Sequence, residues 1–261
     1  MTPKWRELAD RLAERIRRGE YAAGQRLPHI RELVEAGEGS KSTVHAAYKA
    51  LEAEGLVTSS RGHGTVVRRQ EPLKRLGIDR YDKAKWRDSD EVAFIADRLA
   101  SGRAYKRGDQ TQTVERVTAP PAVAAAYGLP EGAEVYARAR LVKEGSRPTH
   151  TLTSYYRPEH VEGTRIVDPS PGPAGPGGGF RVLLDAGYEI DHMREELRAR
   201  AATPEEATRL QLAPGEWVVE LHRTAYTADG TVVEFAVGVH AATRFAWTYD
   251  FQVPDSKATE A

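Results

Sequence analysis

The chain has 261 residues and no cysteine, which excludes a disulfide framework and thiolate metal sites. Its 38 Lys and Arg residues balance 38 Asp and Glu residues, so the total charge gives no indication of a nucleic-acid partner. No apolar run approaches the ~18 residues of a membrane span, and the charged start lacks the apolar core of a secretion signal, so we expect a two-domain cytoplasmic protein.

The first 69 residues are predicted to form three short helices and a hairpin, and they carry 13 Lys and Arg against 9 Asp and Glu. Apolar residues at every third or fourth position predict a helix that ends near Gly19, and Pro28 suits the first position of a second helix. Ser40 is expected to cap a third helix that ends at Gly55. The buried face of this helix is predicted to consist of Val44, Ala47, Tyr48 and Leu51. Two β-branched runs around a glycine-rich turn follow in residues 57–67, so the whole segment is typical of a winged helix-turn-helix.

The third predicted helix begins without a carboxylate. Residues 40–43 supply hydroxyls and one lysine, and no acidic residue appears before Glu52. Because a helix N-terminus favours negative charge, this start suits a DNA phosphate. Lys41 and His45 share the exposed side of the helix and are expected to face the major groove. The alternative is an ordinary solvated helix face.

The remainder of the chain contains an internal repeat. Residues 119–145 resemble residues 202–230, with Arg140 matching Arg223 at an offset of 83. Each copy predicts a helix, a turn and two strands, so we expect an α+β domain with an antiparallel sheet and helices on one face. The Gly- and Pro-rich segment 168–179 between the copies is expected to be a surface loop, with a lid over a pocket as the alternative.

Strand alternation places two arginines of the first copy together. Arg138 and Arg140 must share one face of their strand, as must Glu234 and His240 on the last hairpin. Two adjacent guanidiniums repel each other unless an anion lies between them, and Glu234 is expected to supply that anion in the empty protein. A solvated outer face is the alternative for the arginines.

The motif DHMREE, residues 191–196, offers one His and one carboxylate at helical spacing. These are too few ligands for a metal site, so a charged helix face is the preferred interpretation. Glu195 is kept as a residue that faces an effector.

Four motifs in residues 5–67 carry a specific resemblance. In chain order they are LPHIREL, SKSTVH, LEAEGL and GHGT. Together they resemble the winged-helix domain of GntR-family transcription regulators. The resemblance implies DNA contacts at Arg31, Ser40, Lys41, Ser42, Thr43, His45, His63 and Gly64, with Arg61 as a neighbour. Lys41 and His45 stand where the family has arginines, so the operator is expected to differ from the common family half-site.

Residues 80–251 resemble the UTRA effector domain of the HutC branch, whose fold is chorismate-lyase-like. The matching stretches include EVYARARL, RPTHTLTSYY, ADGTVVEF and AATRFAWTYDF. The resemblance implies that the effector contacts Arg138, Arg140 and Glu234. Further candidates for this site are Tyr155, Glu195 and His240, and a place in the apolar core is an equally favoured alternative for Tyr155. Leu152, Gly179 and His240 replace polar residues of members that bind phosphosugars, which favours a less hydroxylated ligand.

The sequence therefore predicts a winged helix over residues 1–68, a linker over 69–80, a UTRA domain over 81–252 and a disordered tail over 253–261. We expect a homodimeric, nucleoid-associated bacterial repressor that leaves an inverted-repeat operator in double-stranded DNA when it binds a small organic anion. No cofactor, metal, catalytic residue or membrane contact is expected. A chorismate-lyase-like enzyme acting on a carboxylated ring and a DNA-binding protein without a ligand remain as alternatives.

Overall fold

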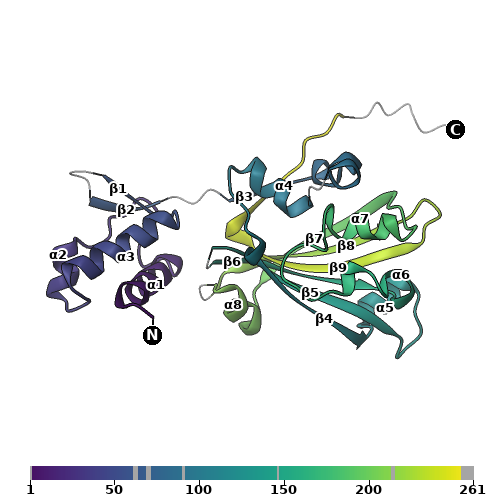
Figure 1. Ribbon diagram of the computed structural model, residues 1–261, viewed down its shortest axis with the longest axis horizontal. Coiled ribbons are helices and arrows are strands. Elements are labelled where there is room, and N and C mark those ends of the chain that lie inside the picture. Colours follow the sequence, from purple (N-terminus) through teal and green to yellow (C-terminus); the bar gives the residue numbers. More distant parts are fainter. Residues whose placement is uncertain are drawn as a thin grey trace. The chain divides into compact units, whose positions relative to one another are not determined.

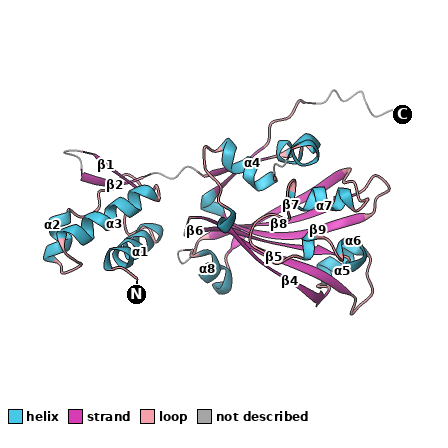
Figure 2. Cartoon of the chain, viewed as in Figure 1, coloured by secondary structure: helices cyan, strands magenta, loops and turns pink. Residues whose placement is uncertain are grey.

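The computed structural model describes residues 2–60, 64–68, 72–89, 92–145, 147–212 and 215–253. The chain divides into two compact units, residues 1–71 with 203–216 and residues 72–202 with 217–261. Figure 1 traces the elements along the chain, and Figure 2 shows that helices dominate the N-terminal part while strands dominate the rest.

The first unit contains the three helices and the hairpin that the sequence predicts. Their bounds are α1 Lys4–Arg17, α2 Ile30–Glu35, α3 Lys41–Ala53, β1 Val57–Ser60 and β2 Gly64–Val67. β1 and β2 pair antiparallel, with Val57 opposite Val67. The predicted apolar face of α3 is buried, because Val44, Ala47 and Leu51 are fully covered by a core that includes Leu8 of α1. The winged helix-turn-helix is therefore confirmed.

The second helix begins later than predicted. Pro28 was expected at its first position, but α2 begins at Ile30 and His29 is the N-cap. The His29 N–H donates to Oε2 of Glu32 at 2.7 Å, which satisfies one of the amides that precede the first helical turn. The Pro28 carbonyl accepts a hydrogen bond from the Tyr48 hydroxyl at 2.5 Å and so ties the entry of α2 to α3.

The second unit is built around a six-stranded antiparallel sheet in the order β4-β5-β6-β9-β8-β7. Its strands are β4 Gln110–Thr118, β5 Glu134–Glu144, β6 Arg147–Tyr156, β7 His192–Ala201, β8 Trp217–Tyr226 and β9 Val232–Ala241. The helices that follow the winged helix in sequence are α4 Ala93–Ala100, α5 Pro121–Tyr127, α6 Pro158–Val161, α7 Gly178–Asp185 and α8 Pro204–Leu210. The short helical turns are η1 Ile78–Tyr81, η2 Ala84–Asp88, η3 Arg107–Asp109, η4 Arg165–Val167 and η5 Ala242–Arg244.

The internal repeat corresponds to the two halves of this sheet. In each copy a helix is followed by a paired hairpin, α5 with β5 and β6, then α8 with β8 and β9. β6 pairs with β9 at the centre, so the two copies extend outward from that contact. Arg140 lies opposite Leu152 in the first hairpin, and Arg223 lies opposite Ala236 in the second. The predicted antiparallel α+β arrangement is confirmed.

Helices cover both faces of the sheet, whereas the sequence predicted helices on one face. Val123 and Tyr127 of α5 pack with Phe235 and Tyr155 on one side. On the other side Leu183 of α7 belongs to the same core cluster as Tyr156. Figure 1 shows α5 and α7 on opposite sides of the strands. Because neighbouring residues of a strand point to opposite faces, Tyr155 and Tyr156 belong to different layers.

Two segments fold differently from their prediction. The expected linker contains β3, Leu73–Leu76, which pairs in parallel with β10, Phe245–Thr248. Residues 192–201 form β7 rather than a charged helix. β7 is an edge strand, and charged residues are common on edge strands because they oppose further strand pairing.

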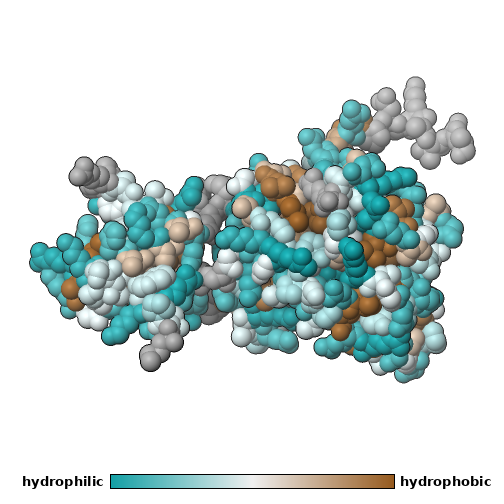
Figure 3. Space-filling model, in the orientation of Figure 1, coloured by the Kyte–Doolittle hydropathy of each residue, from teal (hydrophilic) through white to brown (hydrophobic). Residues whose placement is uncertain are grey.

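The surface view in Figure 3 shows mostly hydrophilic residues with a few separate apolar patches. Across the described ranges, no helix has the length and apolar character required to cross a membrane.

Candidate DNA interface and effector site

The start of α3 has the geometry expected of a phosphate-binding helix end. Ser40 is the N-cap, and its hydroxyl accepts a hydrogen bond from the Thr43 N–H at 3.2 Å. The first turn contains no acidic residue, so the positive end of the helix keeps its charge. Gly39 precedes the cap, and a Cβ at this position would lie 2.9 Å from Cγ2 of Thr43. The turn between α2 and α3 therefore requires a residue without a side chain.

Lys41, Ser42 and His45 are exposed on the side of α3 opposite its buried stripe, as the sequence predicts. Lys49 lies on the same helix but pairs with Glu52 at 2.8 Å. The chemistry of this face, an ammonium, an imidazole and hydroxyls beside free backbone amides, suits phosphates and base edges in a major groove.

The remaining predicted DNA contacts are Arg31, Gly64, Arg61 and His63, and the structure describes the first two. Arg31 is exposed, and its guanidinium pairs with Glu35 one turn later at 2.7 Å. This pair is solvated and weak enough for a phosphate to replace the carboxylate. Gly64 begins β2 with φ +76°, a conformation that favours glycine. Arg61 and His63 lie outside the described residues.

The predicted effector residues are spread over both faces of the sheet. The strand register places Arg138 opposite Ser154 and Arg140 opposite Leu152, and it aligns Ser154 with Ala236 of β9. Alternation then adds further side chains to this layer, which we call the polar face. The polar face comprises Gln112, Arg138, Arg140, Leu152, Ser154, Tyr156, Glu195, Arg223, Glu234 and His240.

Tyr155 is the predicted effector residue that the polar face leaves out. It belongs to the opposite layer, with α5, and its carbonyl accepts a hydrogen bond from the Tyr127 hydroxyl at 2.6 Å. Tyr156 takes its place on the polar face, where its hydroxyl donates to Oε1 of Glu234 at 2.8 Å.

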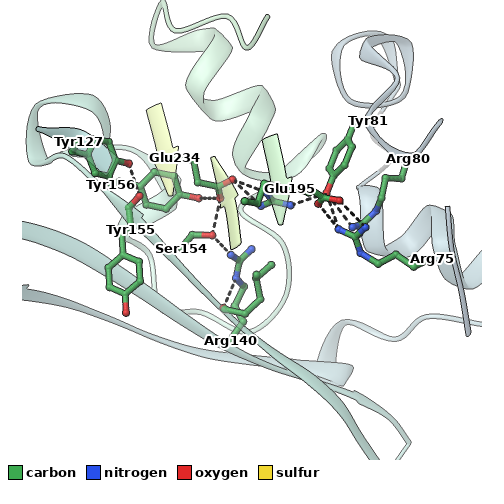
Figure 4. A network of polar contacts seen from close by, with 12 residues as sticks. Arg75, Arg80, Tyr81, Tyr127, Arg140, Ser154, Tyr155, Tyr156, Glu195 and Glu234 are labelled. Carbon is green, nitrogen blue, oxygen red and sulfur yellow. Dashed lines mark hydrogen bonds and ion pairs between the residues drawn. The ribbon is translucent and has the colours of Figure 1, made fainter. Parts of the chain in front are cut away.

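Glu234 is present on this face but has a different partner from the one predicted. Its Oε2 accepts hydrogen bonds from Nε and Nη2 of Arg223, at 3.1 and 2.7 Å, and its Oε1 accepts one from Ser154 at 2.6 Å. Burial opposes the charged form of Glu234, but the charges of Arg223 and Arg140 and the hydrogen bonds from Ser154 and Tyr156 together outweigh it, and the pKa of the carboxyl is lowered. Arg140 reaches Glu234 only through Ser154, whose hydroxyl accepts from Nη2 of Arg140 (Figure 4).

Most buried guanidiniums of this unit have a carboxylate partner. Four such pairs have side chains that are at most 13% exposed: Arg75–Glu195, Arg80–Asp97, Arg98–Asp109 and Arg223–Glu234. Each of these arginines is neutralised within the protein.

Arg138 and Arg140 differ from those four arginines, because no described carboxylate forms an ion pair with either of them. Arg138 donates to Oε1 of Gln112 at 2.9 Å and to the Gly172 carbonyl at 3.4 Å. Arg140 donates to Ser154 and, at 3.2 Å, to the Leu152 carbonyl. All of these acceptors are neutral, so two positive charges on the polar face have no carboxylate partner among the described residues.

The pKa values reflect this excess of positive charge. Burial, reinforced by the charge of Arg140, lowers the pKa of Arg138 to about 10. Burial also lowers the pKa of Arg140. Arg223 behaves in the opposite way, because the Glu234 carboxylate raises its pKa in spite of burial. An anion placed near Arg138 and Arg140 would relieve the cost of their positive charges.

The Gly- and Pro-rich segment 168–179 borders Arg138. Gln110 donates to the Gly172 carbonyl at 2.7 Å, and Gln112 donates to the Asp168 carbonyl at 3.3 Å. A side chain at Gly179 would begin 3.5 Å from the Tyr156 hydroxyl. The segment is therefore hydrogen-bonded to β4 and adjoins the polar face.

Glu195 and His240 occupy more distant positions on the polar face. Glu195 forms a bidentate pair with Arg75, at 2.5 and 3.0 Å. His240 is buried and stacks on His150, with ring centroids 4.7 Å apart. Burial, together with nearby arginines, lowers the pKa of both histidines well below the ordinary value.

Four residues in or beside the polar face are not among the sites predicted from the sequence: Arg75, Tyr81, Gln112 and Arg223. Arg223 could have been predicted, because the internal repeat aligns it with Arg140. Arg75 and Tyr81 could not have been predicted, because β3 and η1 are too short to show a periodic pattern in the sequence.

Known protein families match both the N-terminal winged helix and the domain that contains the large sheet. Residues 4–67 match the family of bacterial regulatory proteins called gntR, and residues 105–246 match the UTRA domain. The chain is 79% identical over 259 residues to the HTH-type transcriptional regulator SCO4628 of Streptomyces coelicolor, covering 99% of this chain and 96% of that one. It is 24% identical to the HTH-type transcriptional repressor NagR of Bacillus subtilis, covering 95% and 94% of the two chains.

A solved structure shares the fold. PhnF from Mycobacterium smegmatis superposes with a TM-score of 0.58 at 18% identity, covering 95% of this chain and 100% of that chain. With the winged helix, the antiparallel effector sheet and these relatives together, the chain belongs to the GntR family of DNA-binding transcription regulators and carries a UTRA domain.

Proposed function

We propose that this regulator is a repressor that leaves its operator when a small organic anion binds between Arg138 and Arg140. The observation that carries the proposal is the charge balance around the polar face. Four buried arginines of this unit have carboxylate partners, whereas these two donate only to neutral oxygens among the described residues. A site that keeps two buried positive charges without an internal anion favours an anionic ligand.

The neighbours of the two arginines support a ligand with an apolar portion. Leu152 lies opposite Arg140 on the adjacent strand. Position 238 is a glycine, and a Cβ there would lie 3.2 Å from Cδ1 of Leu152. The ligand that suits this layer has an acid group for the guanidiniums and fewer hydroxyls than a sugar phosphate.

Repression and dimerisation are parts of the same proposal. The relative from Bacillus subtilis is named a repressor. Each protomer has one helix, α3, that would contact bases in the major groove, so an operator with two half-sites needs two protomers. A two-fold homodimer would bind an inverted repeat. Anion binding would then favour a dimer in which the two reading helices no longer fit both half-sites.

A titration of operator release tests the anion site. Fluorescence anisotropy on the full-length protein, with carboxylates, dicarboxylates, phosphate esters and phosphonates as probes, would identify acids that release DNA. Loss of a charge-assisted hydrogen bond costs about 1.5–3 kcal/mol, so Arg138→Ala or Arg140→Ala should need roughly 10- to 150-fold more acid.

The matched control is Arg116→Ala, because Arg116 lies on β4 and pairs with Glu162 at an exposed position. This variant should respond like the natural protein. A variant without Arg138 and Arg140 that still releases the operator at the same acid concentration would overturn the proposal.

A further inference from the structure

The hydroxyl of Tyr81 is the point at which three buried arginines meet. It accepts hydrogen bonds from Arg75 at 2.9 Å, Arg80 at 3.2 Å and Arg223 at 3.3 Å, and it donates to Oε1 of Glu195 (Figure 4). These partners come from β3, η1, β8 and β7. A single phenol oxygen therefore connects four elements.

Through Tyr81 the anion site is joined to β3 by an unbroken series of polar contacts. Arg140 donates to Ser154, Ser154 donates to Glu234, and Glu234 accepts from Arg223. Arg223 also donates to Tyr81, which donates to Glu195, and Glu195 accepts from Arg75. We call this series the Tyr81 relay. Its members Ser154, Glu234, Arg223 and Arg75 are at most 4% exposed.

The relay supplies one polar link between β3 and the large sheet, beside the packing of Phe245 of its partner strand β10 against His240 of β9. Among the described strands β3 pairs only with β10, in a separate two-stranded sheet. Arg75 of β3 has a buried Nε with no partner in the described part of the chain, so its guanidinium is held by Glu195 and Tyr81 through its other nitrogens. The Arg75–Glu195 pair thus links the small sheet to β7 of the large one.

β3 is also the first described element after the winged helix in the chain. Residues 69–71 are all that separate the end of the wing region, at residue 68, from Pro72 and β3. β3 therefore lies close in sequence to the DNA-binding unit.

We propose that Tyr81 and Glu195 are positioning residues that couple occupancy of the anion site to β3. This inference rests on the proposed function for its ligand, and it adds the Tyr81 relay as the path from the anion site to β3. An anion that draws Arg140 away from Ser154 changes the hydrogen bond that the Ser154 hydroxyl donates to Glu234. Arg223 is shared between Glu234 and Tyr81, so its balance between them shifts and alters the hold of Glu195 on Arg75.

The first test needs no ligand, because Arg140→Ala perturbs the far end of the relay. Backbone hydrogen exchange of residues 73–76 is measured in the full-length protein. Residues that share a network couple by 0.5 kcal/mol or more, so Arg140→Ala should change the exchange rate of β3 at least about twofold. The same change should be absent when Arg140→Ala is added to Tyr81→Phe, which removes the hydroxyl and keeps the ring.

Tyr105→Phe is the matched control. The Tyr105 hydroxyl is buried in the same unit and has no hydrogen-bond partner among the residues described, so its removal should leave the effect of Arg140→Ala intact. Exchange in α5, on the opposite face of the sheet, should be equal in all variants and reports any general loss of stability. An unchanged β3 in Arg140→Ala, or the same change with and without the Tyr81 hydroxyl, overturns the relay.

A second arm uses inorganic phosphate as the anion, with sodium chloride at equal ionic strength as the reference. The relay predicts that phosphate changes the exchange of β3 in the natural protein and in Tyr105→Phe, but not in Tyr81→Phe. If phosphate binding, followed by calorimetry, is normal in Tyr81→Phe while β3 is unaffected, Tyr81 acts on coupling and not on affinity. A positive result with Arg140→Ala and no phosphate binding to any variant would support the relay and count against phosphate at the anion site.

Discussion

Glu234→Gln should destabilise the effector unit far more than the removal of other carboxylates from the same sheet. The substitution preserves the shape of the side chain and an oxygen that accepts from Ser154 and Tyr156, at 2.6 and 2.8 Å. It replaces the oxygen facing Arg223 by an amide nitrogen, so both donors of Arg223 lose their acceptor. Removing one partner of a buried ion pair costs about 3–5 kcal/mol, because the remaining charge stays buried.

This magnitude is measurable by urea unfolding. Three of the four tryptophans, Trp86, Trp217 and Trp247, belong to the effector unit, so fluorescence mainly follows its unfolding. With a slope of about 2–3 kcal/mol per M urea, a loss of 3–5 kcal/mol lowers the midpoint by roughly 1–2 M. The slope itself should remain the same.

Glu220→Gln is the matched control for this change. Glu220 lies on β8, pairs with Arg200 at 2.7 Å and is 20% exposed, so its loss should cost about 1 kcal/mol or less. Adding Arg223→Met to Glu234→Gln removes the stranded charge and should recover part of the lost stability. Equal midpoint shifts for Glu234→Gln and Glu220→Gln would refute the reasoning.

Three further predictions concern DNA binding and pH. Lys41→Ala with His45→Ala should weaken specific operator binding by about 1–3 kcal/mol for each base-edge hydrogen bond removed, measured by anisotropy, while Lys49→Ala, whose side chain pairs with Glu52, should change it less. A footprint of the full-length protein should cover an inverted repeat, and affinity should fall steeply with salt because phosphate contacts release counterions. Stability should be constant above about pH 6.5 and fall below it, by up to ~1.4 kcal/mol per pH unit for each of His150 and His240.

The sign of the pH effect follows from the direction of the shifts. The pKa of each buried histidine is lowered in the folded protein, so on acidification the unfolded chain takes up protons first and is favoured. Replacing the exposed His192 should leave this dependence intact, and a urea midpoint that stays constant between pH 7.5 and 5.5 would contradict it. For the DNA-binding predictions, the contrary results are an unchanged operator affinity in the double variant and protection of a single half-site or a direct repeat.

The winged helix could be predicted almost completely because its signals are local. Apolar spacing, the cap at Ser40 and the glycine-rich turn each act within a few residues of the chain. The large sheet could be predicted because the repeat is visible in the sequence. What local signals predicted wrongly was β7, whose Glu and Arg residues favour a helix in isolation and become a strand by pairing with β8.

The residues of the polar face could not be predicted from local patterns, because their grouping depends on the register between strands. Leu152 and Tyr155 lie three apart on one strand and so cannot share a face, which excludes Tyr155 from the face of Leu152. Strand parity places Tyr156, four residues from Leu152, on that face instead. Glu234 pairs with Arg223, and not with Arg138 or Arg140, because β8 and β9 are neighbouring strands. β3 forms only by pairing with β10, which lies near the other end of the chain.

The two-copy construction of the sheet also indicates how a gene duplication could produce a ligand site. Arg140 and Arg223 are equivalent residues of the two hairpins, and the position diagonal to each on the partner strand is His150 in one copy and Glu234 in the other. One copy thus contains its own counter-charge, while the other has an aromatic ring that burial keeps neutral. Under the proposed function, a difference at this single position is enough to give one hairpin an internal counter-charge and leave the other to an external anion.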